Sequence, residues 1–131
     1  MKTIVMLGMM LAGSSALFAQ DKQKSCKDFK TGTFTNVDEE TGASTLIERT
    51  ATMQTESTDG GKNKTTFSLK WKDDCTFVLK PTKETLRKYK DWPKSTTFTI
   101  TIAETMEDGY KQESSSTLSD VRVKNTLKKV K

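Results

Sequence analysis

Histidine is absent from the 131 residues, and cysteine and proline occur only twice each. Histidine is the commonest general base near neutral pH and the commonest metal ligand, so its absence argues against sites of both kinds. The sequence also has no nucleophile-elbow serine motif, no glycine-rich phosphate loop and no convincing pair of carboxylates. We therefore expect no enzyme, no cofactor and no metal site, although acid–base work by an isolated Asp or Glu stays open.

Long apolar runs are missing except at the N-terminus. Lys2 is followed by an apolar run over residues 4–13 and then by small residues up to Ala19. A charged start, a short apolar run and a small-residue end are typical of a secretory signal peptide, and the run is short for a membrane span. We predict a signal peptide over residues 1–19, a flexible lead-in over 20–26 and one β domain over 27–131. The protein is then expected in the periplasm, at the cell surface or outside the cell.

Cys26 and Cys75 are the two cysteines, and both lie beyond the predicted signal peptide. In an exported chain they are expected to form a disulfide, which on a loop-entropy model stabilises the fold by up to roughly 4 kcal/mol. The chain has 22 basic and 17 acidic residues, a net charge of +5. That mild excess predicts no nucleic-acid partner.

Large apolar side chains concentrate in residues 67–79, the segment around which the rest of the chain is organised. Phe67, Leu69 and Trp71 alternate with polar residues, and Cys75, Phe77 and Leu79 do so after an Asp73-Asp74 turn. This period of two predicts a half-buried β-hairpin. A three-residue loop over 72–74 would set Trp71 opposite Cys75, Leu69 opposite Phe77 and Phe67 opposite Leu79, with all the large side chains on one face.

Further strands follow from alternation and from turn residues. They are predicted over residues 27–37, 44–56, 95–102, 110–117 and 121–124, the last with an open extension through Leu127 and Val130. Pro81 and Pro93 bound an insert, residues 81–94, with a short helix predicted over 82–91. Sequential strands with short turns predict an all-β antiparallel meander of seven or eight strands closing into a small lipocalin-like barrel or half-barrel. A two-sheet β-sandwich is the alternative.

Several motifs resemble those of a group of small secreted proteins of flavobacteria and their relatives. They are residues 26–34 (Cys-Lys-Asp-Phe-Lys-Thr-Gly-Thr-Phe), 47–50, 54–56 and 70–79, which include an Arg in the second strand and a Trp before the second Cys. The resemblance covers the first half of the mature chain, and residues 81–93 depart from it as an insertion. It implies a secreted or envelope protein and supplies no catalytic residues. A looser similarity links Gly32-Thr33-Phe34 to the first strand of lipocalin-like barrels, where a Gly-x-aromatic motif seals one end.

Arg49 is the most informative polar residue. In a strand over 44–56, Ile47, Arg49, Ala51 and Met53 would face inward and Glu48, Thr50, Thr52 and Gln54 outward. An inward guanidinium needs a partner, which is either a ligand carboxylate or phosphate or an internal acid such as Glu104 or Glu113. Trp71 is a second candidate for ligand binding or for packing on the disulfide. Tyr110 is a third, as a rim residue or as part of the core.

The insert concentrates positive charge around two aromatic residues. The candidate residues for an anionic partner are Lys83, Arg87, Lys88, Lys90 and Trp92. A solvated helix face explains the same pattern. The function hypotheses are therefore an exported, non-enzymatic module that binds a small ligand in a barrel, an envelope protein that binds anionic glycan or lipopolysaccharide through the basic insert, and, least favoured, a hydrolase. The ligand and the oligomeric state are left open.

Overall fold

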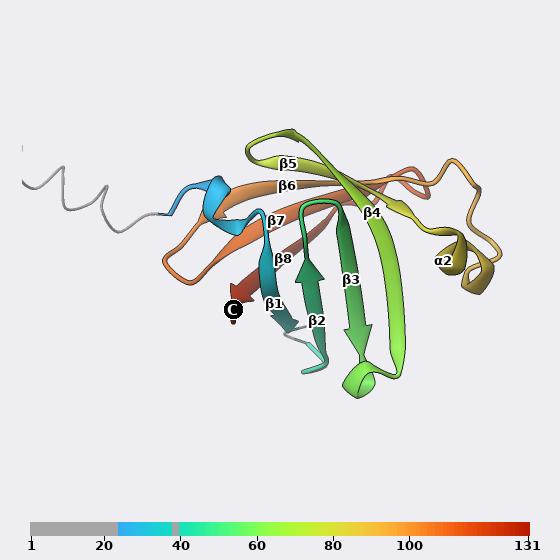
Figure 1. Ribbon diagram of the computed structural model, residues 1–131, viewed down its shortest axis with the longest axis horizontal. Coiled ribbons are helices and arrows are strands. Elements are labelled where there is room, and N and C mark those ends of the chain that lie inside the picture. The colour runs from blue at the N-terminus through green and yellow to red at the C-terminus, as the bar shows by residue number, and fades with distance from the viewer. Residues whose placement is uncertain (1–23, 38–39) are drawn as a thin grey trace, which may run out of the picture.

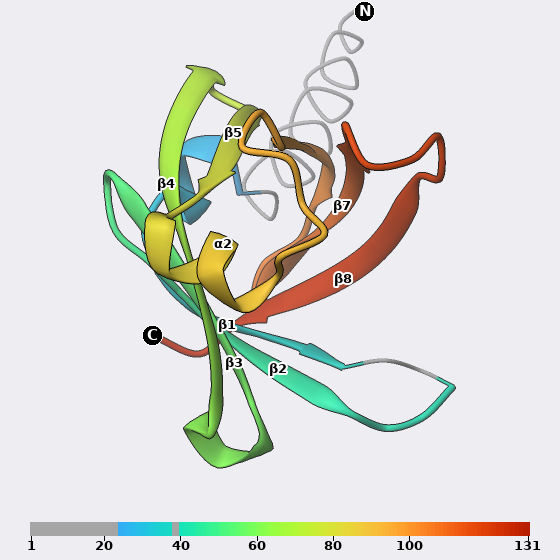
Figure 2. The same cartoon turned by 90° about the vertical axis from the view of Figure 1, so that its right-hand side faces the viewer.

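The computed structural model describes residues 24–37 and 40–131, so the predicted signal peptide and most of the predicted lead-in lie outside the described residues. The chain forms a closed, antiparallel eight-stranded β-barrel (Figures 1 and 2). The strands are β1 (Gly32–Val37), β2 (Ser44–Arg49), β3 (Met53–Thr58), β4 (Asn63–Asp73), β5 (Thr76–Pro81), β6 (Phe98–Thr105), β7 (Gly109–Ser116) and β8 (Val123–Lys129). Two 3-10 turns, η1 (Cys26–Phe29) and η2 (Asp59–Gly61), and one helix, α2 (Lys83–Lys88), complete it.

Each strand pairs with the next in sequence, and β1 pairs with β8 to close the ring. The predicted all-β barrel is thereby confirmed in preference to the sandwich. Closure gives every strand two neighbours, so the apolar inner face is covered without a layer of helices. η1 lies at one end of the barrel and α2 at the other, as Figure 1 shows.

The inner face carries two groups of buried apolar side chains that match the predicted alternation. The group near η1 contains Cys26, Phe29, Phe34, Ile47, Ile102, Tyr110 and Leu127. The group near α2 contains Phe67, Leu69, Phe77, Leu79 and Ile100, with Trp92 and Phe98 packed against it. Trp71 contacts both groups and joins them. The barrel is therefore filled with side chains over most of the inner surface of β4, β5 and β6.

The first predicted strand, 27–37, is wrong in its first half. Cys26–Phe29 forms the 3-10 turn η1, and extended backbone starts only at Gly32. The conformation of Gly32 explains the break, because its φ of +138° is rarely adopted by side-chain-bearing residues. A Cβ there would lie 2.7 Å from the carbonyl oxygen of Lys131. Chain alternation alone does not reveal such a close approach.

The predicted single strand over 44–56 is a hairpin of β2 and β3. The Thr50 hydroxyl accepts a hydrogen bond from the Met53 amide at 3.1 Å, and the Thr50 amide donates to the Met53 carbonyl at 2.9 Å. Threonine favours strands by propensity, but its hydroxyl can also close a turn locally. The turn reverses the predicted faces of β3: Met53 is exposed and Gln54 is buried, while Ala51 is exposed in the turn.

The hairpin of β4 and β5 forms, but its predicted register is wrong by two residues. Trp71 pairs with Phe77 and Leu69 with Leu79, while Cys75 lies in the turn. The turn lies at residues 74–75 in place of 72–74, and a β-bulge between Trp71 and Asp73 shifts the register by one residue. The Asp73 carboxylate accepts a hydrogen bond from the Cys75 amide at 2.9 Å. The disulfide requires this turn, because Cys75 must reach outward to η1.

α2 begins after Thr82, whose side chain caps it, and covers only the first part of the predicted 82–91 helix. Its buried residue is Thr85, whose hydroxyl forms hydrogen bonds with both the amide and the carbonyl group of Thr66 on β4. The Thr66 amide donates to the Thr85 hydroxyl at 2.9 Å, and that hydroxyl lies 2.8 Å from the Thr66 carbonyl oxygen. The insert is thus fixed to the barrel by threonine hydroxyls.

Candidate functional site

Arg49 is the last residue of β2 and points into the barrel, where its side chain is 3 % exposed. Each of its three nitrogens donates to a protein acceptor. Nε bonds to Gln54 Oε1 at 2.8 Å, one terminal nitrogen to the Phe29 carbonyl at 2.9 Å and the other to the Tyr110 hydroxyl at 2.6 Å. The guanidinium therefore joins β2, β3, β7 and η1 at one end of the barrel.

Aromatic rings surround the guanidinium. Its central carbon lies 4.6 Å from the ring centres of Phe34 and Phe77 and 5.7 Å from that of Tyr110. Rings at these distances attract a cation through their negative faces. The acids weighed as partners from sequence lie elsewhere: Glu104 pairs with Lys111 and Glu113 with Arg122, both at the surface. Aromatic faces and neutral acceptors thus take the place of an ion pair at Arg49 in the described part of the chain.

Glu56 on β3 is linked to this group through Gln54. The Gln54 side-chain amide donates to the Glu56 carboxylate at 2.9 Å while its oxygen accepts from Arg49. Burial raises the pKa of Glu56 above 4.5, although the Gln54 hydrogen bond and the charge of Arg49 act the other way. Burial likewise raises the pKa of Tyr110, so its hydroxyl stays protonated at neutral pH.

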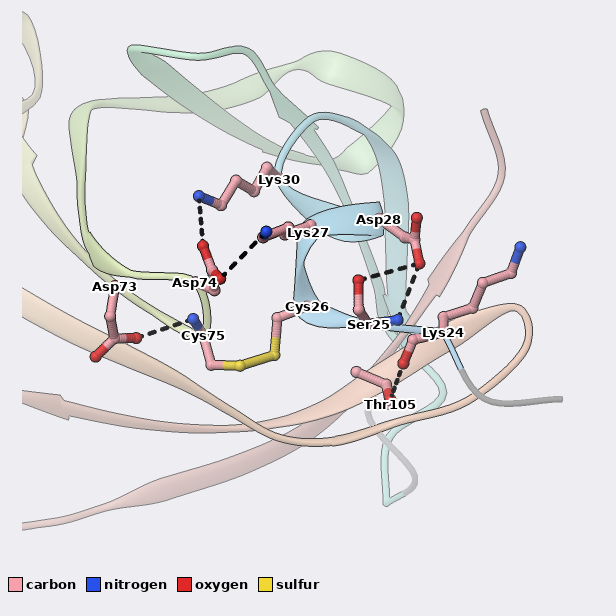
Figure 3. Close-up of a disulfide and its surroundings, with 10 residues drawn as sticks. All are labelled: Lys24, Ser25, Cys26, Lys27, Asp28, Lys30, Asp73, Asp74, Cys75 and Thr105. Atoms are coloured by element: carbon pink, nitrogen blue, oxygen red, sulfur yellow. Dashed lines mark hydrogen bonds and ion pairs between the residues drawn. A yellow bond between two sulfur atoms is a disulfide. The ribbon is translucent and has the colours of Figure 1, made fainter. Parts of the chain in front are cut away.

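The disulfide lies at the same end of the barrel, where Cys26 belongs to the buried group near η1. Cys26 and Cys75 are bonded, as predicted, and tie η1 to the turn between β4 and β5 (Figure 3). Around the bond, Lys27 and Lys30 both approach the Asp74 carboxylate, at 3.8 and 3.3 Å. The disulfide thus holds the turn whose Phe29 carbonyl receives Arg49.

Arg49 and Tyr110 come together at this closed end, and Trp71 lies beside them. Trp71 stacks at a tilt on Phe77, with 4.6 Å between ring centres, and Lys30 Nζ lies 5.0 Å from the centre of its ring. Tyr110 is completely buried, so the structure places it in the core and not at a rim. All three residues contact protein groups, which makes this end a structural closure. A ligand contacting Arg49 would have to displace one of its three acceptors.

Sequence reasoning missed a second site, beside the edge of β8. Among the described residues, β1 pairs with β8 from Phe34 to Asn36 against Leu127 to Lys129, and they provide no strand beside the first half of β8 on that side. A hollow of about 680 Å³, open to solvent, lies at this gap. It is lined by Asn36, Val37, Glu40, Ala103, Glu104, Lys111, Gln112, Glu113, Val123, Lys124, Asn125 and Thr126.

Three of these residues share the inner face of the barrel. Asn36 pairs with Leu127, and Gln112 pairs with both Ile102 and Asn125. Because cross-strand partners point to the same face, the amides of Asn36, Gln112 and Asn125 face inward with the core residues. The Asn36 Oδ1 atom is buried and has no hydrogen-bond partner within the described residues. The only signal in the sequence is the polar residues at these inward positions of β7 and β8. Such residues are equally expected on the solvent-facing side of a strand, so the sequence alone does not reveal the site.

The basic residues of the insert lie on α2 and the loop after it, at the end opposite the disulfide. Lys83, Arg87, Lys88 and Lys90 are exposed, and Trp92 is half-buried. Trp92 stacks on Tyr89 with 4.4 Å between ring centres and 13° between planes, and its ring also contacts Phe98. The structure therefore separates the predicted candidates into the closed end and the insert.

No protein-family model, curated protein or solved structure matches the chain. Within residues 24–37 and 40–131 there is no group of three potential metal ligands. Over the same ranges no helix has the length and apolar character needed to cross a membrane.

Proposed function

We propose that this protein is an exported, non-enzymatic, lipocalin-like binding module that holds a small polar ligand in the hollow beside β8. The observation that carries the proposal is the set of inward amides of Asn36, Gln112 and Asn125 at a gap in the barrel wall. A buried acceptor without a donor costs about 1–3 kcal/mol, and a ligand hydroxyl or amine donating to Asn36 Oδ1 would remove that cost.

The lining favours a ligand rich in hydrogen-bonding groups. Glu113, Lys111 and Lys124 line the hollow together with the amide residues, and its size falls in the range of small-molecule sites, about 300–1,000 Å³. A fatty or aromatic ligand would instead need the apolar interior, which side chains of β4, β5 and β6 already fill. Export, the relation to small secreted flavobacterial proteins and the absence of catalysis belong to the same proposal, and the disulfide supports export.

A native mass spectrum of the protein purified from its own host is the first test. We expect a mass lacking residues 1–19 and a retained small molecule that dissociates at higher collision energy. The second test titrates ¹⁵N-labelled protein with glucose, a disaccharide, succinate, an amino acid and a nucleoside in turn. Side-chain amide shifts at Asn36, Gln112 and Asn125 are expected with at least one of them.

A pair of variants separates the hollow from the rest of the surface. Asn36→Leu removes the unpaired amide and should reduce retention and shifts at least tenfold, because the apolar side chain cannot receive a ligand donor. Asn63→Leu is the matched control, since Asn63 is exposed at the start of β4 and its side chain bonds only to Asp59 among described residues. If no small molecule is retained and no probe shifts these amides, the binding proposal fails. An uncleaved N-terminus would count against export alone.

A further inference from the structure

Positive charge is concentrated in the last residues of β5 and the insert that follows them. Residues 80–94 contain six basic residues against two acidic ones, a net charge of +4, whereas the whole chain has +5. The remaining 116 residues therefore carry 16 basic and 15 acidic residues and are close to neutral. Lys83, Arg87 and Lys90 are exposed, and none of them forms an ion pair within the described part of the chain. Electrostatic attraction of an anion is thus directed to one end of the molecule.

The charged segment is held rigidly against the barrel. The Thr66–Thr85 hydrogen bonds fix α2 to β4, and Lys88 donates from Nζ to the Lys64 carbonyl at 2.9 Å. After the helix, Tyr89 stacks on Trp92, and Trp92 contacts the core residue Phe98 at 5.4 Å between ring centres. Tyr89 is 36 % exposed, so one aromatic ring is presented to solvent on a support that continues into the core. The backbone and the aromatic pair of this surface are therefore ordered before binding, which reduces the conformational entropy lost on binding.

We propose that this surface, consisting of Lys83, Arg87, Tyr89 and Lys90, binds an acidic polysaccharide. Trp92 stacks on the Tyr89 ring and Lys88 Nζ lies over it at 5.8 Å from the ring centre. A sugar ring would pack against the exposed part of Tyr89, and carboxylates or sulfates of neighbouring sugars would bind the three basic side chains. Lys83 and Arg87 are four residues apart on α2 and hence on the same side of the helix. This proposal is independent of the hollow beside β8, which lies on other strands.

Two other anionic partners fit the surface less well. Insertion into a lipid headgroup layer needs protruding apolar side chains, but the apolar residue of α2, Leu86, is half-buried and the exposed residues of α2 are charged. Single-stranded nucleic acid uses several aromatic platforms in succession, whereas Tyr89 and Trp92 here stack on each other and Lys88 Nζ lies over the Tyr89 ring. A single ring flanked by separated cations suits a chain of charged sugars.

The test measures binding of polygalacturonate by isothermal titration and by retention on an immobilised column, with the fully methyl-esterified polymer as the neutral control. We expect binding to the acid form and none to the ester. Binding to the acid form should weaken steeply between about 50 and 500 mM salt, because the electrostatic screening length shortens over this range. The variant Lys83→Gln/Arg87→Gln/Lys90→Gln should bind about tenfold more weakly, since three exposed ionic contacts of a few tenths of a kcal/mol each are lost. Tyr89→Leu should bind polygalacturonate at least about threefold more weakly.

The control variant Lys70→Gln/Lys72→Gln/Lys128→Gln removes the same charge from exposed positions outside the insert and should bind like the wild type. An equal loss in both triple variants would overturn the proposal, because binding would then follow net charge alone. Equal affinity for the methyl ester would overturn the ionic component. Tighter binding to phosphatidylglycerol vesicles or to single-stranded DNA than to polygalacturonate would replace the polysaccharide with that partner. Circular dichroism confirms that each variant is folded.

Discussion

At the scale of single residues, Arg49 shows how a buried cation is held in this barrel without an ion pair. Three neutral acceptors and three aromatic faces surround it, and the described residues place no carboxylate within ion-pair distance. A planar guanidinium suits such a site, because it donates in several fixed directions and stacks on rings, whereas an ammonium acts as a point charge. Arg49 therefore stabilises the closed end by linking β2 to η1, β3 and β7.

Replacing Arg49 tests this role. Arg49→Met leaves the Phe29 carbonyl, Gln54 and Tyr110 without their donor and should lower the free energy of unfolding by about 2–4 kcal/mol. Arg49→Lys should lose less, because one ammonium keeps the charge but cannot bond to all three acceptors. Equilibrium unfolding in guanidinium chloride with the disulfide intact measures both. Arg122→Met, which breaks an exposed pair with Glu113, is the control and should change stability by about 0.5 kcal/mol or less. A similarly small change in Arg49→Met would refute the structural role.

The Glu56 carboxyl predicts a pH dependence of stability. Its pKa is raised in the fold, mainly by burial, so just above pH 4.5 the folded state binds more protons than the unfolded state. Stability from this group is then complete below pH 4.5 and is lost as pH rises through the folded pKa. The side chain introduced by Glu56→Gln does not titrate. The free energy of unfolding of this variant, relative to that of the wild type, should therefore increase from pH 4 to pH 7. Urea unfolding at both pH values gives this difference, and a constant difference between the two proteins would contradict the assignment.

At the scale of elements, alternation identified which residues enter the core but not where the chain turns. The inward positions of Phe67, Leu69 and Phe77 follow from the sequence, yet the register was wrong because the turn lies at residues 74–75 in place of 72–74 and a bulge adds one residue to β4. The Thr50 hydroxyl split a predicted strand in the same manner. Both errors arise from local side-chain-to-backbone bonds, which compete with strand propensity and have no period to detect. The hollow was missed for a related reason, since inward Gln112 and Asn125 look like exposed strand residues.

The disulfide belongs to this scale, because it joins one turn to another. Cys26 and Cys75 are 49 residues apart, so the double variant Cys26→Ala/Cys75→Ala should lower the free energy of unfolding by about 2–4 kcal/mol. η1 should also loosen, and proton exchange of the Arg49 side chain, followed by NMR, should speed up as the Phe29 carbonyl withdraws. Reductant should weaken the wild type and leave the double variant unchanged. If the variant is as stable as the oxidised wild type, the bond does not hold this end.

At the scale of the whole molecule, closure of the barrel could be predicted from the sequence because sequential strands with short turns must cover their apolar face. The extent of pairing between each two neighbouring strands could not be predicted from the sequence. β6 and β7 pair along nearly their full length, from Phe98 with Ser116 to Thr105 with Tyr110, whereas β1 and β8 share a short ladder. Strength of pairing depends on where β1 ends relative to β8, and that register joins the two most distant strands in the sequence.

This short ladder predicts that the barrel opens first between β1 and β8. Native-state hydrogen exchange should show the amides of Thr33 and Val130, which bond across this junction, exchanging at a lower free energy than β6 and β7 amides and with little dependence on denaturant. Gly32→Ala should lower the free energy of opening at this junction further, because the new Cβ would clash with the Lys131 carbonyl oxygen and the φ of residue 32 is unfavourable for alanine. The core amides should change less. Exchange of the junction only by global unfolding would contradict this order, whereas local opening would widen the gap beside β8 where we propose that a ligand binds.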